Sequence, residues 1–295
     1  MFDTSTTVSP PQIYVSIDGG EPRLHRVDRD LVDFTPTPLT DSQHTADIVV
    51  KDIDEHENRW IVPMRSGLHF TGLQLAPGAS LLPTTLPDAL RLIFYGDSIT
   101  QGVMALGAEA TVDCADGTRS FAHLTGRAFQ ATTHQVGFGG QGILRPGNGG
   151  VGTAGQSLGW NFHGSSVDPQ FQPHAVIVNQ GTNDHAYEGA AFRPAYRTYL
   201  DRTRAAHPHA WLFAMSPFGG YHAEDIAWAV AQTRDARTVY VDTAGWLSPS
   251  QDDFNDGCHP NVRGHAKAAR RLTAVIQATT GWTPVTDRSV ELSGE

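Results

Sequence analysis

Ser98 lies in a stretch whose composition changes abruptly from apolar to polar. Residues 92–95, Leu-Ile-Phe-Tyr, are typical of a buried strand, and Gly96 and Gly102 bracket the polar residues that follow. In an open α/β sheet, ligands bind beyond the carboxyl ends of the strands, so a serine at this point could be a nucleophile. A serine after a strand also often caps the next helix, and this stretch alone favours neither interpretation.

A serine hydroxyl is a weak nucleophile until a base accepts its proton, and that base is most often a histidine oriented by a carboxylate. The segment 255–261, Asn-Asp-Gly-Cys-His-Pro-Asn, contains such a pair in Asp256 and His259. It follows the last expected strand and precedes the last expected helix, which places it at the same edge of the sheet as Ser98. A short loop would let Asp256 bind one ring nitrogen of His259 while the other nitrogen faces Ser98.

Acyl transfer also needs hydrogen-bond donors for the oxyanion that develops on the substrate. The backbone N–H of Ser98 is one candidate. Gly140, in the glycine-rich segment after the second expected strand, is another, because glycine lets a backbone N–H approach closely. Asn183 follows the third strand and could donate from its side chain, although an asparagine there is also typical of a turn or a helix cap. Ser98, Gly140, Asn183 and His259 each follow a different expected strand, which predicts one shared site.

The elements that would position these residues alternate between strands and helices from about residue 89 onward. Expected strands are 90–95, 134–138, 175–179, 211–215 and 239–241, and expected helices are 120–130, 192–206, 223–234 and 262–279. Strands that alternate with helices form a parallel sheet covered on both faces. We therefore expect residues 89–295 to form a three-layer α/β/α, flavodoxin-like domain with a parallel five-stranded sheet.

Residues 1–88 follow a different pattern, with short apolar runs separated by clusters of Asp, Gly, Pro and Asn. Expected strands are 13–17, 45–50, 60–62 and 68–75, and residues 77–87 are typical of a linker. Several short strands at this spacing predict a small, all-β antiparallel sandwich domain. Such a domain could pack against the second domain or form the interface of a homo-oligomer.

The connection over residues 141–172 is unusually long for a compact domain and holds many glycines. Loops of this length are usually functional or disordered. Trp160 and Phe162 lie in this connection, where they would either wall a substrate pocket or bury themselves to stabilise an ordered surface loop.

The chain as a whole has the composition of a globular protein. Of its 295 residues, 39% are hydrophobic and 18% are charged, so a packed core is feasible. A net charge of −10 argues against nucleic acid or an anionic membrane as the main partner. No apolar run approaches the ~18 residues that a membrane span needs. The first residues lack a basic region followed by an apolar stretch, so we expect a cytoplasmic protein unless a leader has been removed.

Two cysteines, Cys114 and Cys258, are too few for a disulfide scaffold or a zinc cluster. We expect two inert thiols, because a disulfide between them would be unusual in the cytosol. The chain has 14 histidines, but none has a spacing typical of a metal site, and we expect neither a metal nor an organic cofactor. His185 and His265 are expected to be structural or exposed rather than catalytic.

Four segments of the chain resemble, in order, the sequence blocks of the SGNH (GDSL-type) hydrolases. Gly-Asp-Ser-Ile at 96–99 is similar to the first block, Gly140 to the second, Gly-Thr-Asn-Asp at 181–184 to the third, and Asp-Gly-Cys-His at 256–259 to the last. The resemblance covers about residues 89–280 and implies the three-layer fold. It also implies these roles: Ser98 as nucleophile, His259 as base, Asp256 as the carboxylate that orients it, and an oxyanion hole formed by Ser98, Gly140 and Asn183.

The two-part layout is similar to that of carbohydrate esterase family two and related acetylxylan esterases. Residues 41–46, together with Gly78, resemble the sandwich of those enzymes, and residues 134–136 resemble their second block. Those enzymes remove acetyl groups from sugars, and some lack a carboxylate partner for the histidine, which Asp256 supplies here. Members that degrade polysaccharides are usually exported, so the lack of a leader favours small acetylated sugars, or other small acyl esters, over polymeric xylan.

Together these features predict a serine esterase that hydrolyses short acyl esters, above all acetyl esters, of carbohydrates or small alcohols through an acyl-enzyme intermediate. We expect Asp97, Gly139 and Trp160 to contact the substrate. Two alternatives stay open. One is a thioesterase or lysophospholipase of the same superfamily, and the other is a carbohydrate-binding protein with an inactive hydrolase domain. The expected partner is a small acylated molecule such as an acetylated sugar, and neither nucleic acid nor a membrane is expected.

Overall fold

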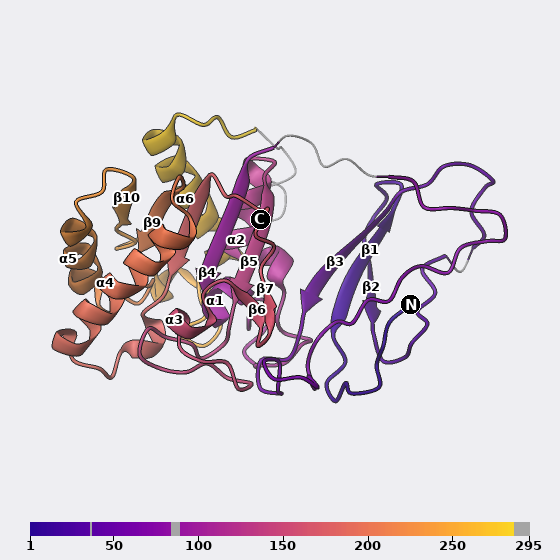
Figure 1. Ribbon diagram of the computed structural model, residues 1–295, viewed down its shortest axis with the longest axis horizontal. Helices are drawn as coiled ribbons and strands as arrows, with labels where there is room; N and C mark the ends of the chain where they lie inside the picture. The colour runs from indigo at the N-terminus through magenta and orange to yellow at the C-terminus, as the bar shows by residue number, and fades with distance from the viewer. Residues whose placement is uncertain (36, 84–88, 286–295) are drawn as a thin grey trace.

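The computed structural model describes residues 1–35, 37–83 and 89–285, and these form two visibly different parts (Figure 1). Residues up to 83 form an N-terminal region around one small antiparallel sheet. Residues from 89 onward form a larger α/β region, in which helices lie on both sides of a central sheet. The expected domain boundary after residue 88 and part of the expected linker fall on residues 84–88, outside the described residues, so this boundary stays a prediction.

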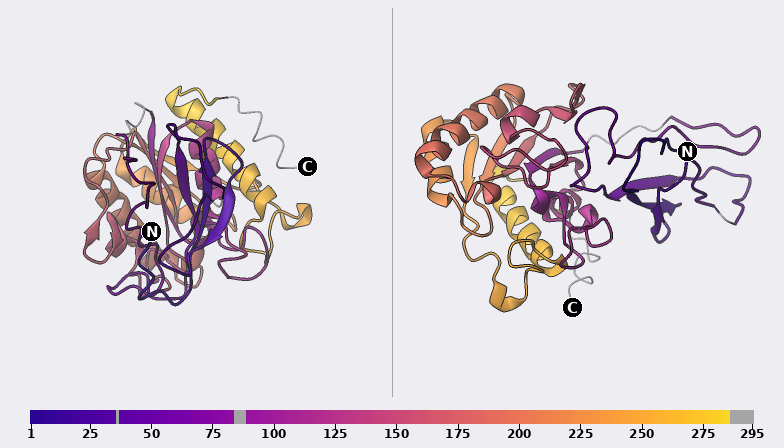
Figure 2. Two further views of the ribbon diagram at one scale, coloured as in Figure 1. Left: turned by 90° about the vertical axis from the view of Figure 1, so that its right-hand side faces the viewer. Right: turned by 90° about the horizontal axis from the view of Figure 1, so that it is seen from below.

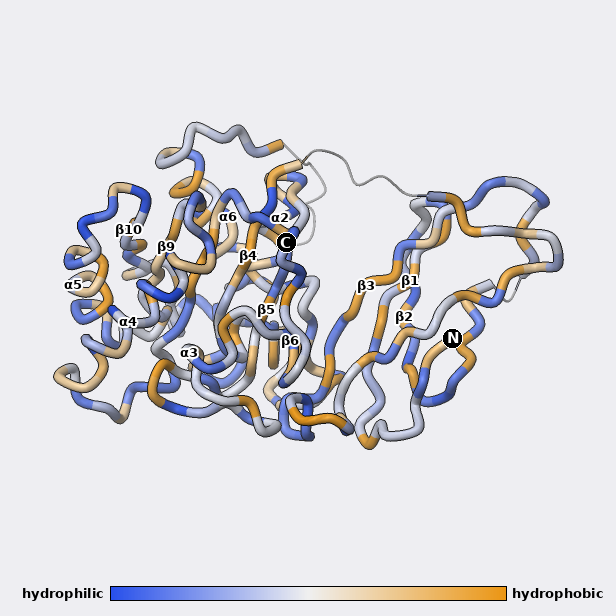
Figure 3. The backbone as a smooth tube through the Cα atoms, viewed as in Figure 1, coloured by the Kyte–Doolittle hydropathy of each residue, from blue (hydrophilic) through white to orange (hydrophobic). Residues whose placement is uncertain are grey.

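The central sheet has five parallel strands in the order β5, β4, β8, β9, β10. Their bounds are Arg91–Gly96 for β4, Thr132–Gly137 for β5, Ala175–Asn179 for β8, Trp211–Met215 for β9 and Thr238–Val241 for β10. The inner strands are almost wholly buried, as apolar runs covered on both faces must be, and Figure 3 shows hydrophobic residues along β4. This strand order confirms the expected flavodoxin-like, three-layer fold.

Four long helices cover the two faces of this sheet. Their bounds are Phe121–Ala128 for α2, Gly189–Ala206 for α4, Ala223–Thr233 for α5 and Val262–Thr280 for α6. One apolar core packs α2 and α6 against one face, and a second core packs α4 and α5 against the other. The views in Figure 2 show α6, in yellow, on the opposite side of the sheet from α4 and α5. Among the described residues, no helix combines the length and the apolar character needed to cross a lipid bilayer.

The chain reverses its direction of travel across the sheet between β4 and β8. From β4 it proceeds to β5 at one edge, and from β8 it proceeds to β9 toward the other edge. Connections that diverge in this way leave space beyond the carboxyl ends of the two strands, where ligands bind in folds of this class. The short helix α1, Ser98–Gln101, follows β4, and the 3₁₀ turn η2, Thr182–Asp184, follows β8.

The N-terminal region contains a three-stranded antiparallel sheet in the order β2, β1, β3. The strands are Gln12–Ile17 for β1, Arg23–Arg26 for β2 and Ala46–Asp52 for β3. Asp18 and Gly19 take positive φ angles, which suits a tight turn between β1 and β2. The apolar side of this sheet is small, since Ile13 and Val15 pack with Phe2 and Val27. The expected all-β character of this region is confirmed, and so are the expected strands 13–17 and 45–50.

The two other expected strands in this region, 60–62 and 68–75, are wrong. Asn58 explains the first case, because its side chain accepts from the N–H groups of Trp60 and Ile61 and donates to the carbonyls of Ile61 and Pro63. Those bonds occupy backbone groups that a strand ladder would need. In the second segment only Phe70 pairs, through an isolated bridge to Phe2. The described part of this region therefore has one sheet, without the second sheet of the expected sandwich.

The long connection between β5 and β8 holds secondary structure of its own. It contains helix α3, Ala154–Ser157, and a small hairpin formed by β6, Trp160–Phe162, and β7, Ser165–Ser166. Phe162 packs against a cluster that includes Trp60 of the N-terminal region and Phe138. This contact agrees with the second alternative for Phe162, a side chain that stabilises an ordered loop. Trp160 instead remains 40% exposed.

Candidate active site

Ser98 is the first residue of α1, immediately after the turn that ends β4. Asp97, not Ser98, caps this helix: its side chain accepts from the N–H of Ile99 at 2.9 Å. The interpretation of Ser98 as a helix cap is therefore wrong, and its hydroxyl is free for another partner. That partner is His259, whose Nε2 lies 2.9 Å from the Ser98 Oγ.

His259 is held in turn by Asp256. The Nδ1 of His259 lies 2.8 Å from the Asp256 Oδ2, while the Oδ1 of Asp256 accepts from the N–H groups of His259 and Cys258 at 2.6 and 2.9 Å. An ionised carboxylate only accepts hydrogen bonds, so Nδ1 carries the ring proton and the neutral ring presents a lone pair at Nε2. The hydrogen-bonded order is therefore Ser98, His259, Asp256, as their spacing in the sequence predicts.

The environment of Asp256 favours its charged form. Burial alone would raise the pKa of its carboxyl, but hydrogen bonds from the backbone and ring of His259 and from the backbone of Cys258 outweigh burial and hold this pKa below its ordinary value. The side chains of Asp256 and His259 are 27% and 16% exposed, so both are partly accessible to solvent.

The loop that carries this pair is fixed at both ends. Phe254 and Pro260 form an isolated bridge, and the Asn255 N–H donates to the His259 carbonyl at 3.0 Å. Asn261 then caps α6 by accepting from the N–H of Gly264. The Asn255 side chain also donates to the carbonyl of Met104, just beyond α1, which ties the loop to the segment after the nucleophile.

The expected oxyanion donors meet beside Ser98. Asn183, in η2, donates from its Nδ2 to the Gln141 carbonyl at 2.9 Å and to the Asp97 Oδ2 at 3.3 Å. It therefore bonds the third block to the first block and to the residue that follows Gly140. Gly140 takes a φ of +69°, and a Cβ there would lie 2.6 Å from the Asn148 Oδ1, so only glycine fits without a shift. Within the described residues, the N–H groups of Ser98 and Gly140 donate to no other group.

The three residues expected to contact the substrate differ in their surroundings. Asp97 has no exposed surface, and burial raises the pKa of its carboxyl to about 6. Its carboxylate caps α1, and its expected contact with the substrate stays a prediction. Gly139 is buried as well, and it has no room for a side chain, because a Cβ there would lie 1.4 Å from the Glu55 Oε2 of the N-terminal region. Trp160 is exposed on β6, where its role stays a prediction.

Asp184 is a functional candidate that the sequence reasoning left without a role. Its carboxylate is fully buried and accepts from the N–H groups of Ile143, Leu144 and Arg145 at 2.7, 2.8 and 3.3 Å. It thereby fixes the segment that follows Gly140. The only signal in the sequence is the position of Asp184 directly after Asn183.

The remaining cysteine and histidine predictions can be placed as well. Cys114 and Cys258 are both free, as expected, and burial raises the pKa of the Cys258 thiol to about 11. His265 is fully buried and accepts from the Phe121 N–H, which confirms a structural role. His185 is exposed and contacts the Thr182 carbonyl. No cluster of three or more His, Cys, Asp or Glu side chains in the described ranges has the arrangement of a metal site.

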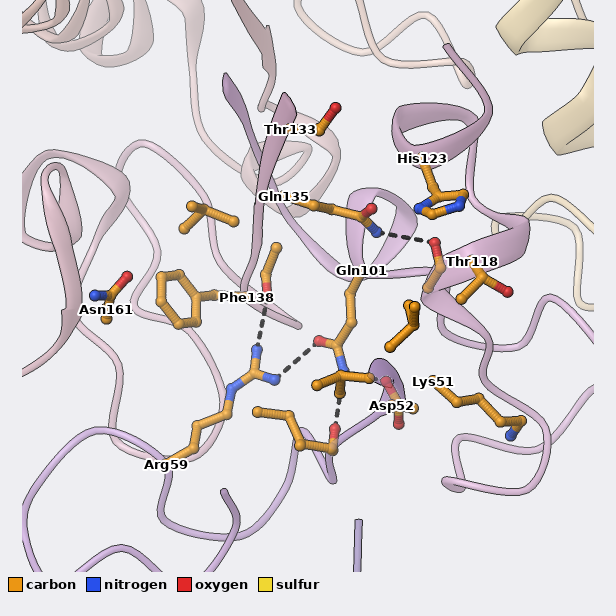
Figure 4. A pocket seen from close by; sticks show the side chains of 16 residues that line it. Lys51, Asp52, Arg59, Gln101, Thr118, His123, Thr133, Gln135, Phe138 and Asn161 are labelled. Carbon is orange, nitrogen blue, oxygen red and sulfur yellow. Dashed lines mark hydrogen bonds between the residues drawn. The ribbon is translucent and has the colours of Figure 1, made fainter. Parts of the chain in front are cut away.

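A cleft of about 380 Å³ lies beside this site, between β3 and the edge strand β5 (Figure 4). Lys51, Asp52 and Arg59 line it from the N-terminal region, and Gln101 and Gln135 line it from the α/β region. None of Ser98, Asn183, Asp256 and His259 lines it. The cleft therefore marks the junction of the two parts rather than the position of the expected chemistry.

Comparison with protein families and curated proteins places this geometry in context. The model of the GDSL-like Lipase/Acylhydrolase family matches residues 94–267, more than half of the chain. The chain is 25% identical over 232 residues to the acetylxylan esterase / glucomannan deacetylase of Cellvibrio japonicus, covering 70% of this chain and 61% of that protein. It is also 25% identical over 247 residues to the cellulase/esterase CelE of Acetivibrio thermocellus, covering 73% of this chain and 28% of that protein. The match thus spans less than two thirds of either relative.

Two solved structures share the fold of both parts of the chain. A carbohydrate esterase family 2 enzyme with a carbohydrate binding domain, from Corynascus thermopiles (Myceliophthora fergusii), superposes with a TM-score of 0.76 at 21% identity, covering 95% of this chain and 90% of that one. A family two carbohydrate esterase from Clostridium thermocellum in complex with cellohexaose gives a TM-score of 0.74 at 21% identity, covering 93% and 87%. At these identities the likeness shows the fold.

Proposed function

The chain belongs to the GDSL-like Lipase/Acylhydrolase family, and from this premise we propose that it is a serine carboxylic ester hydrolase that removes short acyl groups, acetyl above all, from carbohydrates or other small alcohols. The observation that carries the proposal is the hydrogen-bonded series of Ser98, His259 and Asp256 at the carboxyl edge of the sheet. A nucleophile, a base and an orienting carboxylate in this order are what acyl transfer to serine requires.

In the first step, the Ser98 Oγ attacks the ester carbonyl carbon while the Nε2 of His259 accepts the hydroxyl proton. Asp256 stabilises the imidazolium that forms, because its carboxylate already binds Nδ1. The carbonyl π electrons move to oxygen and give a tetrahedral oxyanion. His259 then donates its proton to the departing alcohol as the C–O bond breaks, leaving an acyl group on Ser98.

The oxyanion is stabilised by the N–H groups of Ser98 and Gly140 and by the amide of Asn183. In the free protein the Nδ2 of that amide donates to the Gln141 carbonyl at 2.9 Å and to the Asp97 Oδ2 at 3.3 Å. The longer bond is the weaker of the two. We expect the oxyanion to replace the Asp97 contact, while the bond to Gln141 keeps the amide in position.

In the second step, a water molecule attacks the acyl carbon with His259 as base, and Ser98 departs with its proton restored. No metal or organic cofactor is needed for either step. Acetyl esters of sugars are the preferred substrate class because the curated relative from Cellvibrio japonicus is named for acetylxylan and glucomannan deacetylation.

The test is the initial rate of hydrolysis of p-nitrophenyl esters from acetate to decanoate by the wild-type chain, with the Ser98→Ala variant as the blank. A Ser98-dependent rate that is highest for acetate supports the proposal, and acetate release from acetylated mono- and oligosaccharides then identifies the alcohol. A rate that rises with acyl length would contradict the short-chain esterase proposal and favour a lysophospholipase or thioesterase. Sugar binding without Ser98-dependent turnover of any ester would instead favour a carbohydrate-binding protein with an inactive hydrolase domain.

A further inference from the structure

Arg59 is a buried arginine of the N-terminal region that reaches into the α/β region. Its side chain is only 3% exposed, and its guanidinium donates to the Gln101 Oε1 at 2.9 Å and to the Gly137 carbonyl at 3.2 Å. The guanidinium carbon also lies 5.1 Å from the centre of the Phe138 ring. Figure 4 shows the Arg59 and Gln101 side chains pointing toward one another at the junction cleft.

Gln101 is held at both ends of its side-chain amide by residues 52–60, which we call the N-terminal arm. While the Oε1 of Gln101 accepts from Arg59, its Nε2 donates to the Asp52 Oδ1 at 2.8 Å and to the Ile53 carbonyl at 3.0 Å. Gln101 is the last residue of α1, and Ser98 is the first. The N-terminal arm is therefore hydrogen-bonded to the last residue of the short helix that begins with Ser98.

The N-terminal arm also contacts the segment that leads to Gly140. Gly137, whose carbonyl accepts from Arg59, is the last residue of β5 and lies three residues before Gly140. The backbone N–H of Arg59 donates to the Gly149 carbonyl at 3.1 Å. Glu55 fills the space over Gly139, the residue next to Gly140. One buried side chain thus bonds the helix of the nucleophile and the strand end that leads to a proposed oxyanion donor.

A charge in this position carries an energetic penalty that other interactions must offset. Burial lowers the pKa of Arg59 to about 10, although Glu55 and Asp52 nearby oppose that shift, so the guanidinium stays charged at neutral pH. Within the part of the chain that the structure describes, the Nε of Arg59 has no hydrogen-bond partner, and Phe138 supplies only a ring face. An apolar side chain would fill the same space without this penalty, so packing alone does not account for an arginine here.

We propose that Arg59 is a positioning residue for the ester hydrolysis proposed above, and that it sets the spacing between Ser98 and Gly140 through its bonds to Gln101 and Gly137. The N-terminal region is then part of the catalytic unit. A separate binding module would not need to bond both elements that carry the reacting groups. The inference rests on the proposed function, because spacing matters only if Ser98 reacts.

The experiment compares Arg59→Met, which removes both donors and the charge, with Arg59→Lys, which keeps the charge and can serve one acceptor. Tyr14→Phe is the matched control, because the Tyr14 hydroxyl crosses the same junction and donates to Asp116 at 2.9 Å but, among the described residues, makes no hydrogen bond to α1 or to residues 137–140. For each protein, kcat and KM are measured on p-nitrophenyl acetate. The rate at which a p-nitrophenyl phosphonate labels Ser98 is followed by intact mass.

We expect Arg59→Met to lower kcat about ten- to hundredfold with KM within about twofold of wild type, and to slow phosphonylation in proportion, because small misplacements of reacting groups have effects of this size. Arg59→Lys should recover part of the loss, and Tyr14→Phe should match wild type. If Arg59→Met does not fold by circular dichroism, a severalfold kcat deficit in folded Arg59→Lys carries the same conclusion.

Folded Arg59 variants with wild-type kcat and wild-type labelling would overturn the role of Arg59 while leaving the esterase proposal intact. Equal kcat losses in Arg59→Lys and Tyr14→Phe would also overturn it, because any damage to the junction would then have the same effect. Absence of Ser98-dependent turnover and labelling in the wild-type chain would instead overturn the proposed function itself.

Discussion

The turn that carries Ser98 is held from two sides, and the two sides differ in their exposure to water. On one side, the Asp256 and His259 side chains are 27% and 16% exposed and bind Ser98 through a single chain of hydrogen bonds. On the other side, Asp52 and Arg59 are 5% and 3% exposed and bind the far end of α1. His259, the base in the proposed mechanism, lies with Asp256 on the more exposed side, whereas Asp52 and Arg59, which hold α1, are buried.

This difference has a physical reason. A base in acyl transfer must change its charge during the reaction, which water and a nearby carboxylate make easier. A buried ion such as Arg59 is costly to move or to leave unpaired, so it favours one arrangement of its neighbours. The catalytic side is therefore expected to respond to substitution mainly in rate, and the buried side in rate and in stability together.

The largest effect is expected at the exposed side. His259→Gln removes the base that faces Ser98, and we expect a loss of at least about a thousandfold in kcat on p-nitrophenyl acetate. The thermal midpoint should stay close to wild type, because the His259 side chain bonds only Ser98 and Asp256 among the residues described. Steady-state kinetics and a thermal melt measure the two quantities. A variant that keeps a tenth of the wild-type rate would assign the base to another group.

A smaller loss of kcat is expected for a substitution at Asn183, which bonds Asp97 beside Ser98. Asn183→Ala removes one of the three proposed oxyanion donors, and removing one such donor costs about a hundredfold in kcat. KM should change little, because the oxyanion exists only in the transition state and intermediate. The measurement is kcat and KM on the acetate ester. An increase in KM at constant kcat would show that Asn183 binds the ground state of the substrate instead.

Asp184→Asn tests a buried carboxylate that holds the segment after Gly140, close to the proposed site. One carboxylate oxygen accepts from Ile143 and the other from Leu144 and Arg145, and an amide can keep only one of these acceptors. We expect kcat to fall about tenfold and the thermal midpoint to fall by a few degrees. Asp168→Asn is the matched control, because Asp168 makes a local turn to Gln170 in the same long connection. Equal effects in both variants would contradict a specific role for Asp184.

The catalytic edge could be predicted from the sequence because its signals are local. Ser98 and Asn183 lie within four residues of the ends of β4 and β8, whose apolar runs are easy to recognise, and the segment that carries His259 lies between the last strand and the last helix. Because parallel strands end at one edge of a sheet, these residues could be expected to lie close together. The N-terminal region gave weaker signals. Its strand β2, Arg-Leu-His-Arg, is largely exposed and lacks an apolar face, and the Asn58 side chain displaces a strand that the apolar residues suggested.

The contacts across the junction could not be predicted at all. Arg59 and Gln101 are 42 positions apart, and Asp52 and Gln101 are 49 apart. An arginine and an aspartate in a polar segment of the sequence are most often solvent-exposed, and nothing local marks these two as buried. Both residues are buried where the N-terminal arm meets α1 and the end of β5, through the bonds of Asp52 and Arg59 to Gln101 and of Arg59 to Gly137.

Asp52, on the buried side, and Asp256, on the exposed side, are expected to change the stability with opposite sign as the pH rises. Burial raises the pKa of Asp52 from 3.8 to about 7, so its stabilising contribution is complete below about pH 4 and is lost as the pH rises toward 7. The pKa of Asp256 is lowered despite burial, so its contribution is present at neutral pH and is lost as the pH falls through that lowered value.

Thermal midpoints of the wild-type chain, Asp52→Asn and Asp256→Asn are therefore measured from pH 4 to pH 8. Asp52→Asn keeps an acceptor for Gln101, and its midpoint should rise relative to wild type by about 5 °C between pH 4 and pH 8. Asp256→Asn should show a constant deficit above pH 5. The buried Asp97, whose pKa burial raises to about 6, is common to all three proteins and cancels in the differences. If the thermal midpoints of Asp52→Asn and wild type changed with pH in parallel, Asp52 would be charged over the whole range. Asp52 and Arg59 would then form a stable buried ion pair.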